Sequence, residues 1–69
     1  MSNDVDYIAN SLLSDYSTNQ KLKRAVENGA RSIVKGIVND FINENVPSLS
    51  GAAWLINLVI DFIFDYFGW

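Results

Sequence analysis

Residues 52–69, AAWLINLVIDFIFDYFGW, decide which fold this chain can adopt. The stretch contains no proline, and only three side chains in it carry amide or carboxylate groups, Asn57, Asp61 and Asp65. Their four-residue spacing places them within about 80° of arc on a helix, as one polar stripe on an apolar rod. We therefore predict a helix over about residues 49–68 that is too apolar for a chain of 69 residues to bury alone.

The apolar side of this helix is expected to face lipid or further copies of the chain. Leu, Ile, Val and Phe each favour insertion by about 0.3–0.6 kcal/mol, whereas one Asp near the centre costs about 3 kcal/mol, so an isolated span is marginal. Tryptophan and tyrosine rings prefer the membrane–water interface, and large apolar surfaces also mark protein interfaces. The predicted membrane-insertion or oligomer surface consists of Trp54, Leu55, Leu58, Val59, Phe62, Ile63, Tyr66, Phe67 and Trp69.

Two further helices are expected before the C-terminal one. Between about residues 4 and 16, apolar side chains recur at intervals of three and four, which is the spacing of one helix face. Ser, Thr and Asn at residues 17–19 break this pattern and offer capping oxygens to the next segment. From about residue 20 to 44 the same spacing predicts a long second helix, with apolar positions at Leu22, Val26, Ala30, Ile33, Ile37 and Phe41.

A separate stripe of small residues runs along the predicted second helix. It consists of Ala25, Gly29, Ser32 and Gly36. A glycine inside a helix costs about 1 kcal/mol relative to alanine, and close approach of another helix is the usual compensation. We interpret the stripe as a close-packing seam, with a plain kink of the helix as the alternative.

Pro47 lies in the one clear break, at residues 45–51, because proline disfavours helix in the residue before it. A connection this short favours antiparallel neighbours, so the last two helices are expected to form a helical hairpin. In such a hairpin, facing residues have a constant sum of residue numbers, and one register gives three complementary pairs. Several registers are available, so a chance match is the alternative. The three pairs are Arg31 with Asp65, Lys35 with Asp61 and Asn39 with Asn57. We call this arrangement the charge ladder.

The composition excludes several classes of function. The chain has no cysteine and no histidine, so disulfides and catalysis by a thiol or an imidazole are excluded. Its carboxylates lack the spacing typical of metal ligation or of acid–base catalysis, so we expect no enzyme activity, no cofactor and no metal site. The first six residues are acidic, unlike a secretory signal. We expect one domain, residues 1–69, at a membrane or outside the cell, with the cytoplasm as the alternative location.

The formal net charge of −3 is unevenly distributed along the chain. All five basic residues lie between residues 21 and 35, with acidic segments on both sides. We expect Lys21, Lys23 and Arg24 to contact lipid head groups, where each cation contributes about 1 kcal/mol near an anionic surface. Nucleic-acid binding is disfavoured because no aromatic residue is interleaved with these cations and the whole chain is acidic.

Two functional hypotheses follow from this pattern. The first is a membrane-active helical protein, a bacteriocin-like or toxin-like pore former or permeabiliser with antimicrobial action, whose C-terminal helix inserts in lipid. In size, helix number and aromatic tail the chain resembles small helical bacteriocins, although it is acidic and no sequence motif carries the likeness. The second is a soluble, self-associating helical module that buries its C-terminal helices in a homo-oligomer. In neither case is a small-molecule substrate expected.

Overall fold

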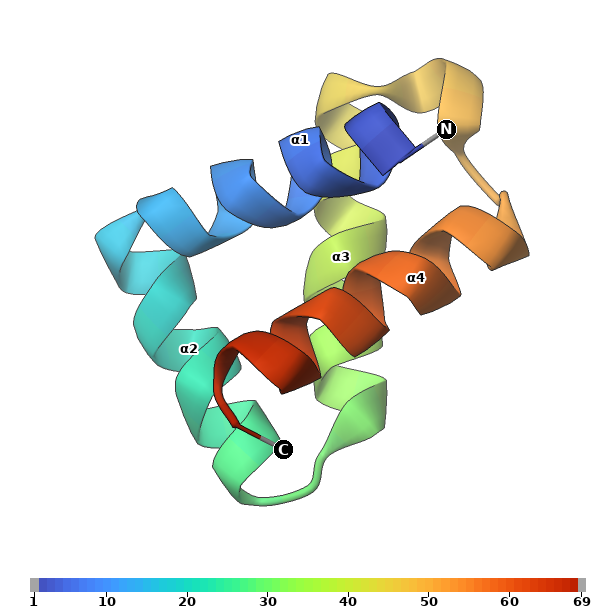
Figure 1. Ribbon diagram of the computed structural model, residues 1–69. Helices are drawn as coiled ribbons and strands as arrows, with labels where there is room; N and C mark the ends of the chain where they lie inside the picture. Colours follow the sequence, from blue (N-terminus) through green and yellow to red (C-terminus); the bar gives the residue numbers. More distant parts are fainter. Residues whose placement is uncertain (1, 69) are drawn as a thin grey trace.

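The structure, a computed structural model, describes residues 2–68 as helices joined by short connections (Figure 1). Residues 2–68 contain no strand, so the predicted all-α class is confirmed. The same residues form four α-helices, so the predicted number of three is wrong. The elements are α1 (Ser2–Ser14), α2 (Tyr16–Glu27), α3 (Arg31–Asn45), the short 3-10 helix η1 (Pro47–Leu49) and α4 (Ala53–Tyr66).

The junction between α1 and α2 is shorter than expected and consists of Asp15 alone. Its carboxylate accepts hydrogen bonds from the Thr18 amide, at 3.0 Å, and from the Thr18 hydroxyl, at 2.7 Å. The first bond satisfies an amide of the first turn that has no partner within the helix. The Asn19 side-chain amide donates to the Leu13 carbonyl, at 2.8 Å, and ties the two helices together. Residues 17–19 therefore lie in the first turn of α2, and the break predicted there occurs two residues earlier, at Asp15.

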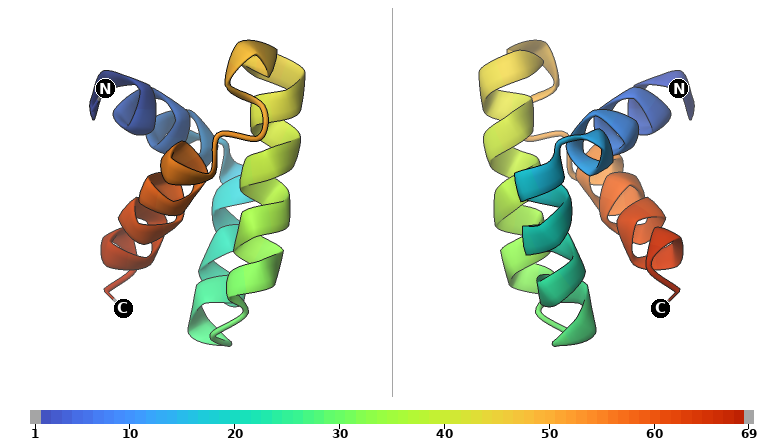
Figure 2. Two further views of the ribbon diagram at one scale, coloured as in Figure 1. Left: turned by 90° about the vertical axis from the view of Figure 1, so that its right-hand side faces the viewer. Right: turned by 90° about the vertical axis from the view of Figure 1, so that its left-hand side faces the viewer.

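The long helix predicted over residues 20–44 is interrupted at Gly29, which has a φ of +65°. The Gly29 amide donates to the Val26 carbonyl, at 2.9 Å, and the Ala30 amide donates to the Ala25 carbonyl, at 2.8 Å. These two bonds form the Schellman motif, which ends a helix at a residue in the left-handed conformation, most often glycine. The chain reverses direction here, and α2 and α3 become separate antiparallel helices (Figure 2).

The helices are arranged in two layers. In one layer α2 and α3 lie side by side, and in the other α1 and α4 pack against each other although they are the first and last helices of the chain (Figure 2). The predicted break at Pro47 is confirmed, because α3 ends before it and η1 and Gly51, with a φ of +80°, redirect the chain. The Ser50 hydroxyl donates to the Asn43 side chain and fastens this connection to α3. Beyond it, α4 turns back and crosses α3 instead of running alongside it (Figures 1 and 2).

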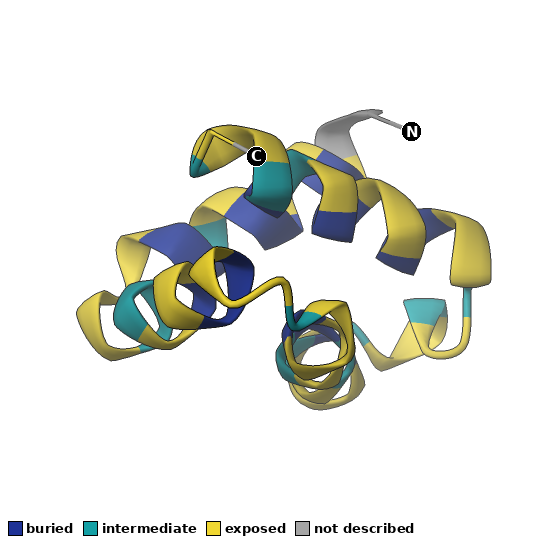
Figure 3. Cartoon of the chain, turned by 90° about the horizontal axis from the view of Figure 1, so that it is seen from below, coloured by how far each residue is buried: buried dark blue, intermediate teal, exposed yellow. Residues whose placement is uncertain are grey.

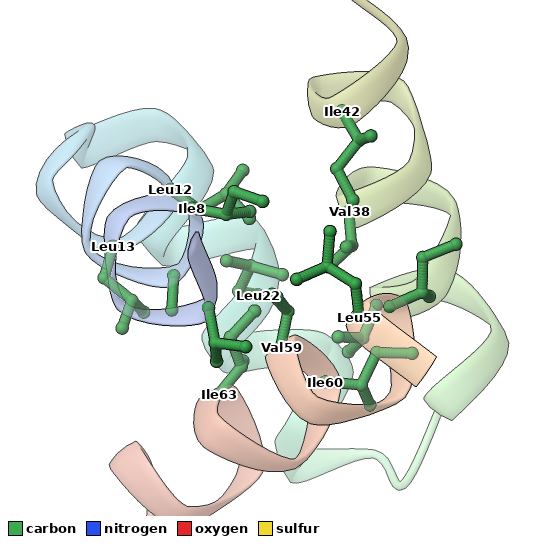
Figure 4. Close-up of a cluster of buried hydrophobic side chains, with 14 of the residues drawn as sticks. Ile8, Leu12, Leu13, Leu22, Val38, Ile42, Leu55, Val59, Ile60 and Ile63 are labelled. Carbon is green, nitrogen blue, oxygen red and sulfur yellow. The ribbon is translucent and has the colours of Figure 1, made fainter. Parts of the chain in front are cut away.

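The core is entirely aliphatic and receives side chains from all four α-helices (Figures 3 and 4). Full burial of one Val, Leu or Ile side chain contributes about 1.5–3 kcal/mol, so this core is the main source of stability. Five of its residues come from α4, the helix that the sequence predicts to be too apolar to bury. That prediction is wrong for the inner side of α4, because α1 and α3 cover it from two directions. The buried α4 residues are Leu55, Ile56, Val59, Ile60 and Ile63.

Candidate functional surface

Every aromatic residue among residues 4–68 lies at least partly at the surface. None of these side chains is buried, although aromatic rings usually dominate the cores of small domains. The four phenylalanines pack against the edge of the aliphatic core, and only the part of the aromatic area that remains exposed is available for contact with something outside the fold. Tyr7, Tyr16, Trp54 and Tyr66 are exposed, and Phe41, Phe62, Phe64 and Phe67 are half-buried.

The outer side of α4 carries a row of large apolar side chains at four-residue spacing. Trp54, Leu58 and Tyr66 have exposed fractions of 44%, 50% and 59%, and the half-buried Phe62 continues the row between them. We call these four residues the α4 ridge. At 1.5 Å per residue, the row extends for about 18 Å along the helix. Within residues 2–68 no helix has both the length and the apolar character that a membrane crossing requires.

The surface predicted for membrane insertion or oligomer formation is therefore divided by the fold. Trp54, Leu58, Phe62 and Tyr66 form the α4 ridge, and Phe67 is half-buried beyond its end. The other members are not available in this conformation or cannot be assigned: Leu55, Val59 and Ile63 are buried in the core, and Trp69 lies outside the described residues.

A groove between α1 and α4 borders the ridge. It has a volume of about 340 Å³, its floor includes Val5, Leu58 and Phe62, and carboxylates line its edge. A second hollow, of about 370 Å³, continues it along α4 beside Tyr66. The carboxylates of this acidic groove are Asp6 from α1 and Asp61 and Asp65 from α4. Val5 and Asp6 were not among the predicted site residues, because nothing in the sequence signals that α1 packs against α4.

The predicted charge ladder is displaced by one helical turn. Arg31 pairs with Asp61, not with Asp65, and the distance from Nη2 to Oδ1 is 3.1 Å. The Arg31 guanidinium also lies 5.8 Å from the centre of the Phe64 ring. The other predicted pairs are absent from residues 2–68: in their place Lys35 and Asn39 share a hollow with Asn57. The helices α3 and α4 cross at a steep angle, so they contact each other over a short length and cannot form a ladder of successive pairs (Figure 2).

The cations predicted to contact lipid head groups lie on α2, in the layer that does not contain the α4 ridge. Lys21, Lys23 and Arg24 are exposed, and among residues 2–68 none of them forms an ion pair within 4.0 Å. Tyr16, with an exposed fraction of 79%, lies at the start of the same helix. A hollow of about 290 Å³ joins Tyr16 to Lys21 and Arg24. We call the surface formed by Tyr16, Lys21, Lys23 and Arg24 the basic face.

The close-packing seam predicted on the second helix does not exist as one surface. Ala25 is buried in α2, Gly29 ends that helix, and Ser32 and Gly36 are exposed on α3. A Cβ atom added at Gly36 would meet nothing within 4 Å, so no second helix approaches it closely. The interruption leaves Gly29 in the connection and places the other three residues on two different helices, which is why their spacing no longer aligns them.

Comparisons with known proteins do not place the chain in a family. No family model matches it, and neither the curated proteins nor the solved structures contain a significant match. Within residues 2–68 there is also no cluster of three or more side chains that could hold a metal ion. The candidate site is therefore defined by the surface of this fold alone. Over residues 2–68 the fold consists of four α-helices with an aliphatic core and aromatic side chains at the surface.

Proposed function

We propose that the protein is a self-associating helical module that works by surface contact through the α4 ridge. The observation that carries this proposal is that no aromatic side chain among residues 4–68 is buried, while four large apolar side chains form a row on one helix. Aromatic residues are enriched at the energetic centres of protein interfaces, where they fill pockets on a partner. Leu58 belongs to both the ridge and the groove, so one contact covers both features.

The size of the molecule supports a weak and reversible association. A standard interface covers about 800 Å² on each partner, which is roughly a fifth of the 4214 Å² surface of this chain. The ridge and groove occupy one side of two short helices, so we expect a contact at the small end of this range. Weak and transient complexes are found at this end of the range, so association is followed up to a protein concentration of about 1 mM.

Sedimentation equilibrium in detergent-free buffer tests the proposal, with two aspartate variants that differ only in position. Leu58→Asp puts a charge on the ridge, and Ile33→Asp puts the same charge on α3, where the original side chain is comparably exposed at 56%. We expect the wild type and Ile33→Asp to associate as concentration rises and Leu58→Asp to remain monomeric. A wild type that stays monomeric at 1 mM would contradict the proposal.

Membrane binding is the second candidate function, and the distribution of aromatics on α4 favours it. Trp54 and Tyr66 stand near the two ends of the ridge, and amphipathic rings of this kind favour the membrane–water interface. In this proposal the folded protein first binds lipid through the ridge, and α4 then separates from α1 and α3 to bury its inner side in the bilayer. Assembly into a pore or a permeabilising toxin would be a later step of the same process.

Tryptophan fluorescence distinguishes this candidate because the chain has only two tryptophans. In a Trp69→Phe variant, Trp54 is the only reporter, and lipid contact is expected to shift its emission to shorter wavelength. Trp54→Phe is the matched control for the other position. Zwitterionic and anionic vesicles loaded with dye are used in parallel, because the carboxylates beside the ridge oppose anionic lipid. Neither an emission shift nor leakage with either vesicle would remove the membrane candidate.

A further inference from the structure

We infer that two copies associate head to tail, with the basic face of one copy docked in the acidic groove of the next. This inference rests on the proposed self-association and adds the partner surface and its orientation. The occupant of the groove is thus a second copy of this chain, with Tyr16 as the apolar contact and Lys23 and Arg24 as the charged ones.

The negative charge of the acidic groove is only partly neutralised by cations of the same copy. Arg31 bonds one of its carboxylates, Asp61, at 3.1 Å. The other two, Asp6 and Asp65, form no ion pair within residues 2–68. Between them lies an apolar floor that includes Leu58 and half-buried Phe62. A complementary surface must therefore present cations at the edge and an apolar or aromatic side chain at the centre.

The basic face has this composition. Lys23 is seven positions after Tyr16, so both side chains lie on the same side of α2, and Arg24 lies about 80° from Tyr16. Lys21 also lines a separate hollow together with two carboxylates of α3, Asp40 and Glu44. Lys23 and Arg24 supply the positive charge that an acidic partner would meet. Tyr16 is among the most exposed large apolar side chains, as expected of an anchor residue.

A two-fold symmetric contact through the groove is less favourable, because it would bring the Asp6 and Asp65 carboxylates of both copies together. Head-to-tail contact removes this repulsion and pairs opposite charges instead. The groove lies on the layer of α1 and α4 and the basic face on α2 in the other layer (Figure 2). Because these are different surfaces, each copy can engage two neighbours, and association continues into chains or closes into rings.

Charge reversal on one face at a time tests the orientation. The acid-face variant is Asp6→Lys/Asp65→Lys, and the base-face variant is Lys23→Glu/Arg24→Glu. We expect each alone to self-associate at least tenfold more weakly than the wild type. In an equimolar mixture the intact basic face meets the intact acidic groove and the two reversed faces also have opposite charges, so association is expected to recover toward that of the wild type. The control variant Ile33→Lys/Gly36→Lys adds two positive charges at exposed positions of α3, outside both docking surfaces, and is expected to associate like the wild type.

The outcomes separate this inference from the function on which it rests. If both reversal variants associate as strongly as the wild type, or if their mixture associates no more strongly than either variant alone, head-to-tail docking is wrong and self-association stands. If the wild type is monomeric at 1 mM and binds only vesicles, both are wrong. Circular dichroism checks that each variant is folded. Where a reversal prevents folding, the milder Asp6→Asn/Asp65→Asn and Lys23→Gln/Arg24→Gln variants take its place. Each alone is expected to associate more weakly than the wild type, and their mixture is expected to form a 1:1 heterodimer, because only one of its two contacts pairs opposite charges.

Discussion

Replacing Gly29 and Gly36 separately by alanine is expected to change stability in opposite directions. Gly29 has a φ of +65° at the end of α2, whereas Gly36 lies inside α3 with helical neighbours on both sides. A Cβ atom added at either position would meet nothing within 4 Å. The two substitutions therefore add the same methyl group without a clash, and they differ only in the backbone conformation that alanine must adopt.

The magnitudes follow from that difference. At Gly29, alanine in the left-handed region costs about 1–2 kcal/mol, partly offset by about 0.4–1 kcal/mol from the narrower unfolded ensemble, so the net loss lies within about 0–1.6 kcal/mol and is centred at about 0.8 kcal/mol. At Gly36, alanine in a helix interior is expected to add about 1 kcal/mol. The two variants should thus differ by about 2 kcal/mol, which corresponds to about 10 °C in melting temperature for a domain of this size.

Urea denaturation followed by circular dichroism measures both changes, with the two variants and the wild type at one protein concentration. Equal slopes of the unfolding free energy against urea would show that the stability difference is not caused by a change in exposed surface. If α2 and α3 formed one continuous helix, Gly29→Ala would stabilise the protein just as Gly36→Ala does. Stabilisation by both substitutions would therefore refute the helix break and the two-layer arrangement that depends on it.

Three further predictions concern the core, the ion pair and the α1–α2 junction. Leu55→Ala should destabilise by about 2–5 kcal/mol because it leaves a cavity, whereas Leu58→Ala, on the exposed ridge, should change stability by about 0.5 kcal/mol or less; thermal unfolding compares them. A double-mutant cycle on Arg31 and Asp61 should give a coupling of about 0–1 kcal/mol, since both side chains are more than half exposed. Hydrogen bonds from the Thr18 hydroxyl, first, and from the Thr18 backbone amide lower the pKa of Asp15 below its ordinary value of 3.8. The stability it contributes is therefore present above pH 3.8 and lost as the pH falls through the lowered pKa, and Asp15→Asn should reduce that loss in an acid titration of unfolding.

The sequence predicts the helical class and the break at Pro47 correctly because both depend on local features. It fails at Gly29 because the apolar spacing continues across the break. The pattern assigns Ile33 and Ile37 to the inner face of α3, whereas the buried positions are one residue later, at Val34 and Val38. Because Gly29 has a positive φ and ends α2, α3 begins as a new helix whose buried face is shifted by one residue from the face that the spacing predicts. No periodicity count detects this, since glycine also fits the interpretation as part of a small-residue seam.

The burial of α4 could not be predicted from its own sequence for a different reason. Apolar area is a property of one helix, but its burial depends on how many neighbours surround that helix. The predicted hairpin assigns only the preceding helix to the C-terminal one as a partner. In the structure α1 packs against α4 as well, from another side than α3 (Figure 1). The acidic groove is a product of this non-local contact, so its α1 residues carry no sequence signal.

The polar stripe on α4 acquires its significance from the fold. Asn57, Asp61 and Asp65 are all exposed. Asp61 pairs with Arg31 and Asn57 shares a hollow with residues of α3, whereas Asp61 and Asp65 line the groove beside the α4 ridge. An apolar ridge alone would bind any apolar surface, including lipid. Carboxylates along its edge penalise anionic lipid and favour a cationic partner, because like charges brought together cost free energy and opposite charges recover part of their desolvation. The only dense group of cations in this chain lies on and next to α2, outside that ridge, so the same molecule carries both halves of a complementary contact.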